Sequence, residues 1–131
     1  MNVKKCLIAS AVVGVVLNVI DFVFQGQIMA ATYAGMSIFR KDMQIPLLVV
    51  SDFVVALVFV WVYDKVRGSF GAGPAGGARF GFYAGVLVNF PAWIILNLLL
   101  VGFPYSLAWV WTIYGIVLSV IAGAVAGALY K

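Results

Sequence analysis

Four long apolar stretches, separated by short polar segments, dominate the pattern of hydrophobic and polar positions along the chain. A bilayer core of about 30 Å is crossed by about 20 mostly apolar helical residues, and each stretch meets that requirement. The expected fold is therefore all-α: an up-down bundle of four transmembrane helices in a single domain. The predicted helices cover residues 6–29, 45–63, 80–101 and 107–130.

Composition supports a membrane protein and narrows its chemistry. The chain is 66% hydrophobic and only 9% charged, with a mean hydropathy of +1.16. A soluble domain carries about a quarter charged residues, so this composition excludes that class. The chain has no His, no Glu and a single Cys, which removes the usual ligands and triads of zinc, haem, iron–sulfur and His-based nucleophilic sites. We expect no enzymatic activity, no metal or other cofactor, and no nucleic-acid partner.

The basic residues are distributed unevenly among the loops, which predicts an orientation. Every Lys and Arg except Arg40 and Lys41 falls at a terminus or between the second and third helices. Such segments face the cytoplasm, so both termini are expected there. The first helix is expected to be retained, because Asp21 interrupts its apolar run and no clear cleavage site follows. Residues 30–43 should extend the first helix or lie on the outer surface, and 68–77 should form a flexible linker.

Asp21 and Asp52 are the most informative polar residues, because each interrupts an apolar stretch. An Asp near the bilayer centre costs roughly 2.5–3.5 kcal/mol, so it normally faces the protein interior or water. A rise of 1.5 Å per residue places Asp21 about 22 Å along the first helix and Asp52 about 10 Å along the second, at a similar depth. Helical periodicity turns other polar side chains to the same faces. The candidate intramembrane polar site comprises Asp21, Asp52, Asn18, Gln25 and Asn89.

Two interpretations of the aspartate pair are open. Two neighbouring carboxyl groups in a low dielectric cannot both ionise unaided, so the pair would share a proton or hold a cation. In the alternative interpretation the pair is structural and protonated, because polar side chains also hold membrane helices together. Its hydrogen-bond partners would then be Asn18, Asn89, Asn97 or Thr112, or it would be reached by Arg40 or Lys41.

Small residues recur at a spacing of four in the third and fourth helices. Such stripes let helix backbones approach closely, which drives association in lipid. They predict packing within the bundle, with homodimerisation or docking onto another subunit as the alternative. The helix-packing residues are Gly77, Gly81 and Gly85 in the third helix and Gly115, Ser119, Gly123 and Gly127 in the fourth.

Two further patterns bear on the architecture. Pro91 lies inside the third helix and predicts a kink, because proline lacks the N–H that an α-helix uses. Gly14 and Asn18 of the first helix align with Gly85 and Asn89 of the third. This alignment suggests an internal repeat of two hairpins.

Two patterns in the segment after the second helix carry less weight. Residues 71–76 fit the dinucleotide fingerprint GxGxxG. That motif needs a preceding strand and a βαβ unit, so no dinucleotide site is expected between two membrane helices. The basic residues Lys65, Arg67 and Arg79 would fix topology or contact anionic lipid head groups.

The pattern as a whole resembles an uncharacterised bacterial family of small four-helix inner-membrane proteins. The resemblance implies this fold and a multi-pass location in the bacterial inner (cytoplasmic) membrane, and it implies no site. It rests on Lys4-Lys5, Asp21-Phe22 with Gly26, Arg79-Phe80-Gly81 with Gly85, Pro91, Pro104 before Leu107-Ala108-Trp109, and the ending Ala122-Gly123, Gly127 and Tyr130-Lys131.

The expected function is that of a non-enzymatic accessory or scaffold subunit, acting through helix–helix contacts in the lipid bilayer. It would form a homo-oligomer or join a larger membrane complex through its glycine-rich faces. The alternative is a small proton- or cation-coupled transporter or channel that uses Asp21 and Asp52. A third hypothesis is a quinone or lipid pocket formed by Pro91, Trp93 and Trp109.

Overall fold

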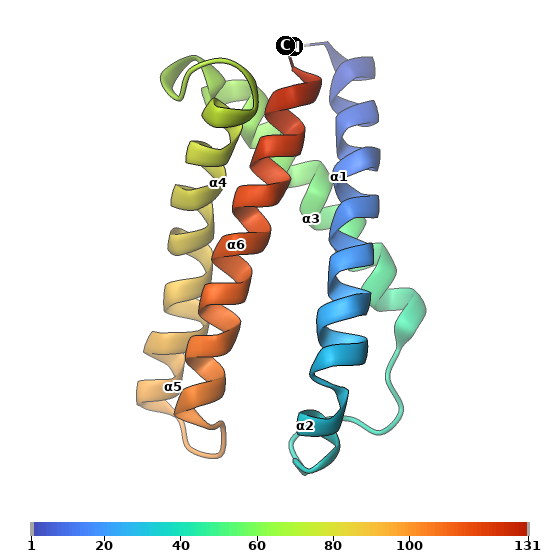
Figure 1. The fold of residues 1–131 in the computed structure, drawn as a ribbon, viewed down its shortest axis with the longest axis vertical. Helices are drawn as coiled ribbons and strands as arrows, with labels where there is room; N and C mark the ends of the chain where they lie inside the picture. Colours follow the sequence, from blue (N-terminus) through green and yellow to red (C-terminus); the bar gives the residue numbers. More distant parts are fainter. Residues whose placement is uncertain (1, 131) are drawn as a thin grey trace.

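The computed structural model describes residues 2–130, which contain helices and no strand (Figure 1). Four helical segments are long and apolar enough to cross a membrane, so the chain is a multi-pass membrane protein. The α-helices are α1 (Val3–Val23), α2 (Ala30–Ala34), α3 (Ile45–Val66), α4 (Gly73–Asn89), α5 (Leu96–Leu99) and α6 (Tyr105–Leu129). Two π-helical segments, Phe24–Ile28 and Phe90–Ile95, extend α1 and α4, and a 3-10 turn, Arg67–Ser69, follows α3.

The predicted all-α four-helix fold is confirmed, but the third spanning helix begins earlier than predicted. It starts at Gly73 instead of Phe80, so the expected flexible linker over 68–77 is wrong for its second half. The physical reason is packing against α6. A Cβ at Gly77 would collide with the carbonyl oxygen of Gly123, so the missing side chain lets two backbones touch and recruits the glycine-rich stretch into α4.

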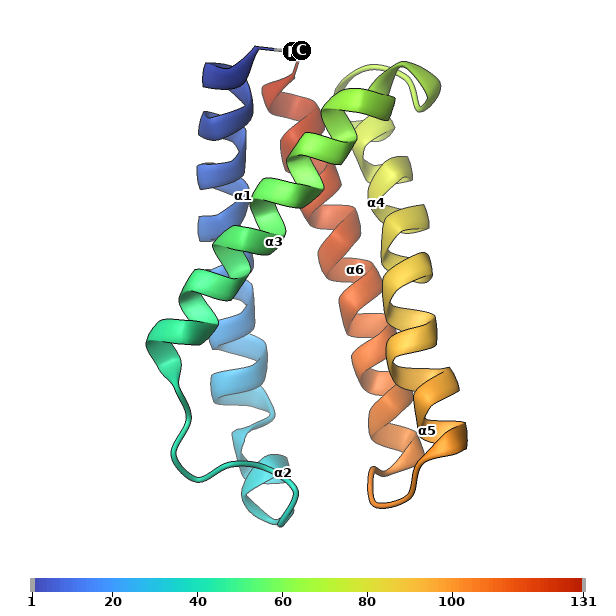
Figure 2. The ribbon, with the colours of Figure 1, turned by 180° about the vertical axis from the view of Figure 1, so that it is seen from behind.

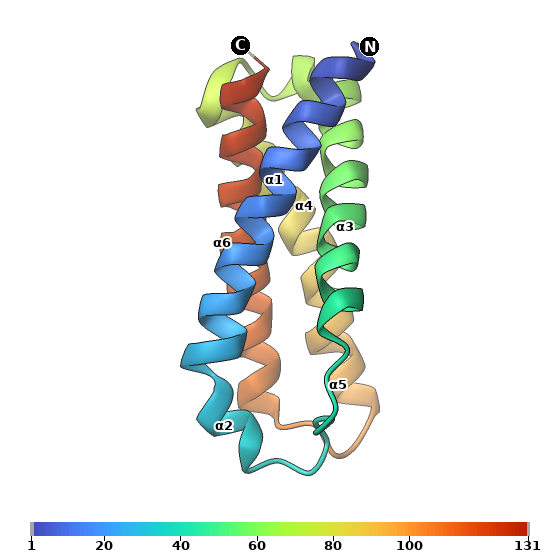
Figure 3. The ribbon, with the colours of Figure 1, turned by 90° about the vertical axis from the view of Figure 1, so that its right-hand side faces the viewer.

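The irregularity predicted at Pro91 takes the form of the π-helical segment Phe90–Ile95. A proline inside an α-helix leaves a carbonyl without its donor, and a wider turn is one way to accommodate that loss. Residues after Ile28 are also irregular: the short helix α2 is followed by non-helical chain from Gly35 to Gln44, which leads to α3 (Figure 3).

The start of α1 and the end of α6 lie at the same end of the bundle (Figure 1). We call this the terminal end (residues 2–5, 64–72 and 129–130) and the opposite one the distal end (residues 29–44 and 100–104). Lys131, which entered the predicted count of cytoplasmic charges, lies outside the described residues.

The spanning helices pack as two hairpins, α1 with α3 and α4 with α6, and α1 and α6 join the two. The α4–α6 contact is the closest. A Cβ at Gly81 would collide with the carbonyl oxygen of Ser119, and one at Gly123 would collide with that of Gly77. The predicted packing residues Gly81, Gly85, Gly115, Ser119, Gly123 and Gly127 all lie at this contact within the chain.

The aligned residues of the suggested repeat make matching contacts. Asn18 Nδ2 donates to the carbonyl of Gly14 at 2.9 Å, and Asn89 Nδ2 donates to that of Gly85 at 2.8 Å. An added Cβ at Gly14 would meet Phe53 of α3, and one at Gly85 would meet α6. Each glycine therefore faces the second helix of its own hairpin.

The hydrophobic core is concentrated in the terminal half of the bundle. Toward the distal end α3 runs away from α4 and α6 and stays beside α1 (Figure 2). A space between the hairpins results, and the candidate site lies there. The core residues are Cys6, Ala9, Val13 and Leu17 of α1, Ala56, Val60 and Tyr63 of α3, Phe80 of α4, and Ala122, Ala126 and Tyr130 at the end of the chain.

Candidate functional site

A cavity of about 170 Å³ lies between the two hairpins, and all four spanning helices line it. Its polar lining is one residue from each helix: Asp21, Asp52, Asn89 and Ser119. The remaining wall is apolar, apart from the backbone of Gly115. The cavity is therefore mostly apolar, with four polar side chains in its wall.

The structure brings Asp21 and Asp52 together. Both side chains are half-buried, and their carboxyl groups are close enough to interact directly. Neither Arg40 nor Lys41 forms an ion pair with them in the described chain. Lys41 Nζ donates instead to the carbonyl of Ala34 at 3.4 Å. The two acids meet without a basic side chain to balance them.

The side-chain partner of Asp21 on the opposite hairpin is Tyr114 of α6, whose hydroxyl donates to Asp21 Oδ1. The Tyr114 ring stacks on Phe24, with centroids 4.1 Å apart and an interplanar angle of 10°. Sequence reasoning missed Tyr114. The available signal was its position well inside an apolar stretch, away from the interfaces where tyrosine is enriched.

The four partners predicted for a structural aspartate pair bond elsewhere, which corrects that part of the interpretation. A polar side chain on a membrane helix is satisfied at little cost by a carbonyl one turn earlier or in a nearby turn. Each of the four donates to a main-chain carbonyl: Asn18 to Gly14 at 2.9 Å, Asn89 to Gly85 at 2.8 Å, Asn97 to Phe103 at 2.6 Å and Thr112 to Ala108 at 2.8 Å. Asn89 still lines the cavity, whereas Asn18 does not.

Gln25, the fifth predicted site residue, serves an aromatic cluster at the distal side instead of the aspartate pair. Its Oε1 accepts the Tyr33 hydroxyl, and that hydroxyl accepts Trp111 Nε1 at 2.7 Å. Phe39 stacks on Tyr33 with centroids 4.4 Å apart. Burial raises the pKa of the Tyr33 phenol, the hydrogen bond from Trp111 lowers it and the nearby charge of Asp21 raises it further, so that Tyr33 keeps its proton.

The quinone or lipid pocket predicted from three residues does not form from those three. A second cleft of about 280 Å³ lies at the distal end and includes Trp93, but neither Pro91 nor Trp109 lines it. Trp109 packs edge-on against Phe90 and Tyr105. Trp93 and Trp109 therefore lie in different surroundings.

The chemistry open to the site is that of two carboxyl groups. Within residues 2–130, no three His, Cys, Asp or Glu side chains gather as a metal site would require. Two carboxyl groups that meet in apolar surroundings can share a proton or hold a cation between them.

Replacing Tyr114 by Phe is expected to destabilise the protein by about 1 kcal/mol, because one hydrogen bond to Asp21 is lost while the ring stacking is kept. Thermal unfolding in detergent measures the change, and the infrared carboxyl band of the variant should shift. Tyr105→Phe is the matched control, because Tyr105 is 51% exposed and only its ring makes a described contact. Equal stabilities for the two variants would contradict the assigned hydrogen bond.

The carboxyl pair, the tyrosine and the cavity are all features of this chain's own residues. Comparison with known proteins adds no precedent for them, since the chain matches no protein-family model, no curated protein and no solved structure.

Proposed function

We propose that the protein is a small transporter or channel that carries protons across the membrane through the Asp21–Asp52 pair. The observation that carries this proposal is the meeting of two carboxyl groups from different helices in one cavity of a membrane-spanning bundle. Ionisable residues are costly at such a depth, and they mark proton and ion pathways when they face a bundle interior.

The surroundings of the pair favour a proton over a fixed structural role. No Lys or Arg of residues 2–130 forms a described ion pair with either acid, so nothing fixes the pair in its doubly ionised state. Tyr114 donates to Asp21, whereas no third residue among residues 2–130 donates a described hydrogen bond to Asp52. A carboxyl pair with one held and one unrestrained member can exchange a proton without losing its framework.

The function of an accessory subunit stays a prediction, and the packing of the glycine-rich faces weakens its support. It relied on the glycine-rich faces of the third and fourth spanning helices as docking surfaces. Gly77, Gly81 and Gly85 face α6, and Gly123 and Gly127 face α4. These faces are occupied within the chain, so a partner would have to use another surface.

The proposal includes a location and an orientation. The terminal end carries Lys4, Lys5, Lys65 and Arg67, and Arg79 lies one turn or two into α4. Under the positive-inside rule this end faces the cytoplasm of a bacterial inner membrane. Four helices enclose little volume, so a homo-oligomer in the bilayer is part of the proposal.

Proton flux in liposomes tests the function. The purified protein is reconstituted with an internal pH-sensitive dye, and a pH gradient is imposed with the membrane potential clamped. We expect the gradient to collapse in proportion to the amount of protein, whereas protein-free liposomes keep it. A parallel experiment with a sodium or potassium gradient distinguishes a proton from another small cation. Fluxes equal to those of protein-free liposomes in both experiments would overturn the proposal.

A further inference from the structure

The cavity lies where α3 and α4 diverge toward the distal end (Figure 2), and both helices contribute to its wall. Two of its wall residues, Val55 and Val88, are 56% and 64% exposed. On the terminal side the next layers of α3 are buried completely, with Val60 at 0% and Tyr63 at 1% exposure. The cavity is therefore covered by a fully buried layer toward the terminal end, while part of its wall lies at the flank of the bundle.

Aromatic rings close the terminal side. Tyr63 packs against Phe80 with centroids 5.3 Å apart and against Tyr130 edge-on at 5.9 Å. Cys6 of α1 is 4% exposed and contacts the Tyr130 phenol. We call these four residues, Cys6, Tyr63, Phe80 and Tyr130, the terminal seal. These residues belong to α1, α3 and α4 and to the end of α6, so both hairpins contribute to the seal. The seal can therefore open only if the hairpins separate at this end.

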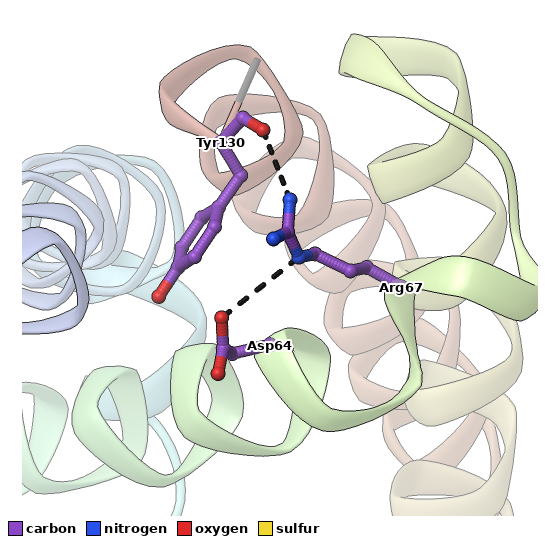
Figure 4. Close-up of polar contacts among 3 residues, drawn as sticks. All are labelled: Asp64, Arg67 and Tyr130. Atoms are coloured by element: carbon purple, nitrogen blue, oxygen red, sulfur yellow. Dashed lines mark hydrogen bonds and ion pairs between the residues drawn. The ribbon is translucent and has the colours of Figure 1, made fainter. Parts of the chain in front are cut away.

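Arg67 adds a polar link between the two hairpins at the seal (Figure 4). Arg67 follows α3, and its Nη1 donates to the main-chain carbonyl of Tyr130, just after α6, at 3.2 Å. Its guanidinium lies 5.1 Å from the centre of the Tyr130 ring. Arg67 Nε also lies 3.8 Å from Asp64 Oδ1, and the Asp64 side chain is only 7% exposed. A rigid guanidinium with several donors is well suited to such a joint.

We propose that Arg67 is a latch that holds the terminal seal closed and so separates the Asp21–Asp52 cavity from the terminal side of the membrane. Its role in transport rests on the proposed function, but the latch itself does not. Releasing Arg67 from the Tyr130 carbonyl removes the hydrogen bond between the end of α3 and the end of α6. The terminal end then opens more often, and the cavity gains access to the terminal side of the membrane. Such an opening is the step that proton passage toward this side would need.

The native Cys6 reports on the seal directly, because it is the chain's one cysteine and lies beneath Tyr130. We expect Arg67→Gln to raise the rate of Cys6 modification by N-ethylmaleimide about tenfold, since a local opening that loses a charge-assisted hydrogen bond becomes more frequent. The matched control is Arg79→Gln, which removes the same charge from an exposed residue of α4 without a described contact to the seal. Its rate should equal that of the wild type. Equal rates for the wild type and Arg67→Gln would overturn the latch.

A second reporter separates local opening from general loosening. Thr112 of α6 is 1% exposed and lies in the distal half, so Thr112→Cys in a Cys6→Ser background should stay unreactive with or without Arg67→Gln. Exposure of both reporters by Arg67→Gln would contradict a latch confined to the terminal end.

This measurement and the flux measurement can fail separately. If Arg67→Gln exposes Cys6 while the wild-type protein conducts no protons, the latch stands and the proposed function fails. If the wild type conducts while Cys6 reacts at one rate in both proteins, the latch fails and the proposed function stands.

Discussion

Asparagine in place of Asp52 is expected to reduce proton flux through reconstituted liposomes to that of protein-free liposomes. Asn has nearly the shape of Asp and keeps its hydrogen-bonding capacity, but it cannot bind or release a proton at neutral pH. Within the described part of the chain, no side chain of the opposite hairpin donates a hydrogen bond to Asp52, so the loss should appear in flux and not in folding. Thermal unfolding in detergent should show unchanged or slightly higher stability, because a membrane-buried carboxyl group is costly.

Asp42→Asn is the matched control for this variant. Asp42 is exposed in the distal loop, away from the cavity, and the substitution makes the same chemical change. Its flux should equal that of the wild type. A fully active Asp52→Asn protein would show that the proton does not pass through the pair.

Alanine in place of Gly81 is expected to cost about 3 kcal/mol of stability, at the upper end of the usual cost of overpacking. The new Cβ would collide with the carbonyl group of Ser119 and the Cα of Val120, which are backbone atoms of α6. Backbone atoms cannot rotate away as a side chain can, so α4 and α6 must move apart along their whole contact. Unfolding in mixed detergent micelles, followed by circular dichroism, measures the loss.

Gly26→Ala is the control, because it makes the same change in another spanning segment. A Cβ at Gly26 would meet only the Phe22 ring at 3.8 Å, which is ordinary van der Waals contact. Alanine restricts the unfolded chain and favours a helix, so this variant should be neutral or stabilised by up to about 1 kcal/mol. An equal loss of stability in Gly81→Ala and Gly26→Ala would contradict the close backbone contact between α4 and α6.

The spanning helices were predictable because membrane thickness sets their length, and apolar runs of that length are visible in any sequence. The equal depth of Asp21 and Asp52 was also predictable, because helical rise converts residue number into depth. The polar faces of the two helices were the basis for expecting that the helices would turn Asp21 and Asp52 toward each other. The structure brings Asp21 and Asp52 together as that alignment suggested, but it gives them different neighbours from those named.

What could not be predicted depends on which helix lies opposite which. Tyr114 bonds to Asp21 only because α6 lies against α1, and no local pattern contains that fact. The glycine-rich faces had two interpretations for the same reason. The sequence pattern of a small-residue face does not depend on whether the helix that packs on it belongs to the same chain or to another one. The start of α4 was misplaced because glycine and proline locally favour a loop, whereas packing of Gly77 on α6 favours a helix.

The two π-helical segments set the angular phase between the two halves of their helices. Phe24–Ile28 follows Asp21 and Phe90–Ile95 follows Asn89, so each helix widens directly on the distal side of the polar residue it contributes. A single residue in an α-helix corresponds to a rotation of about 100°. A one-residue insertion or deletion in either segment would therefore rotate the chain on its distal side relative to Asp21 or Asn89.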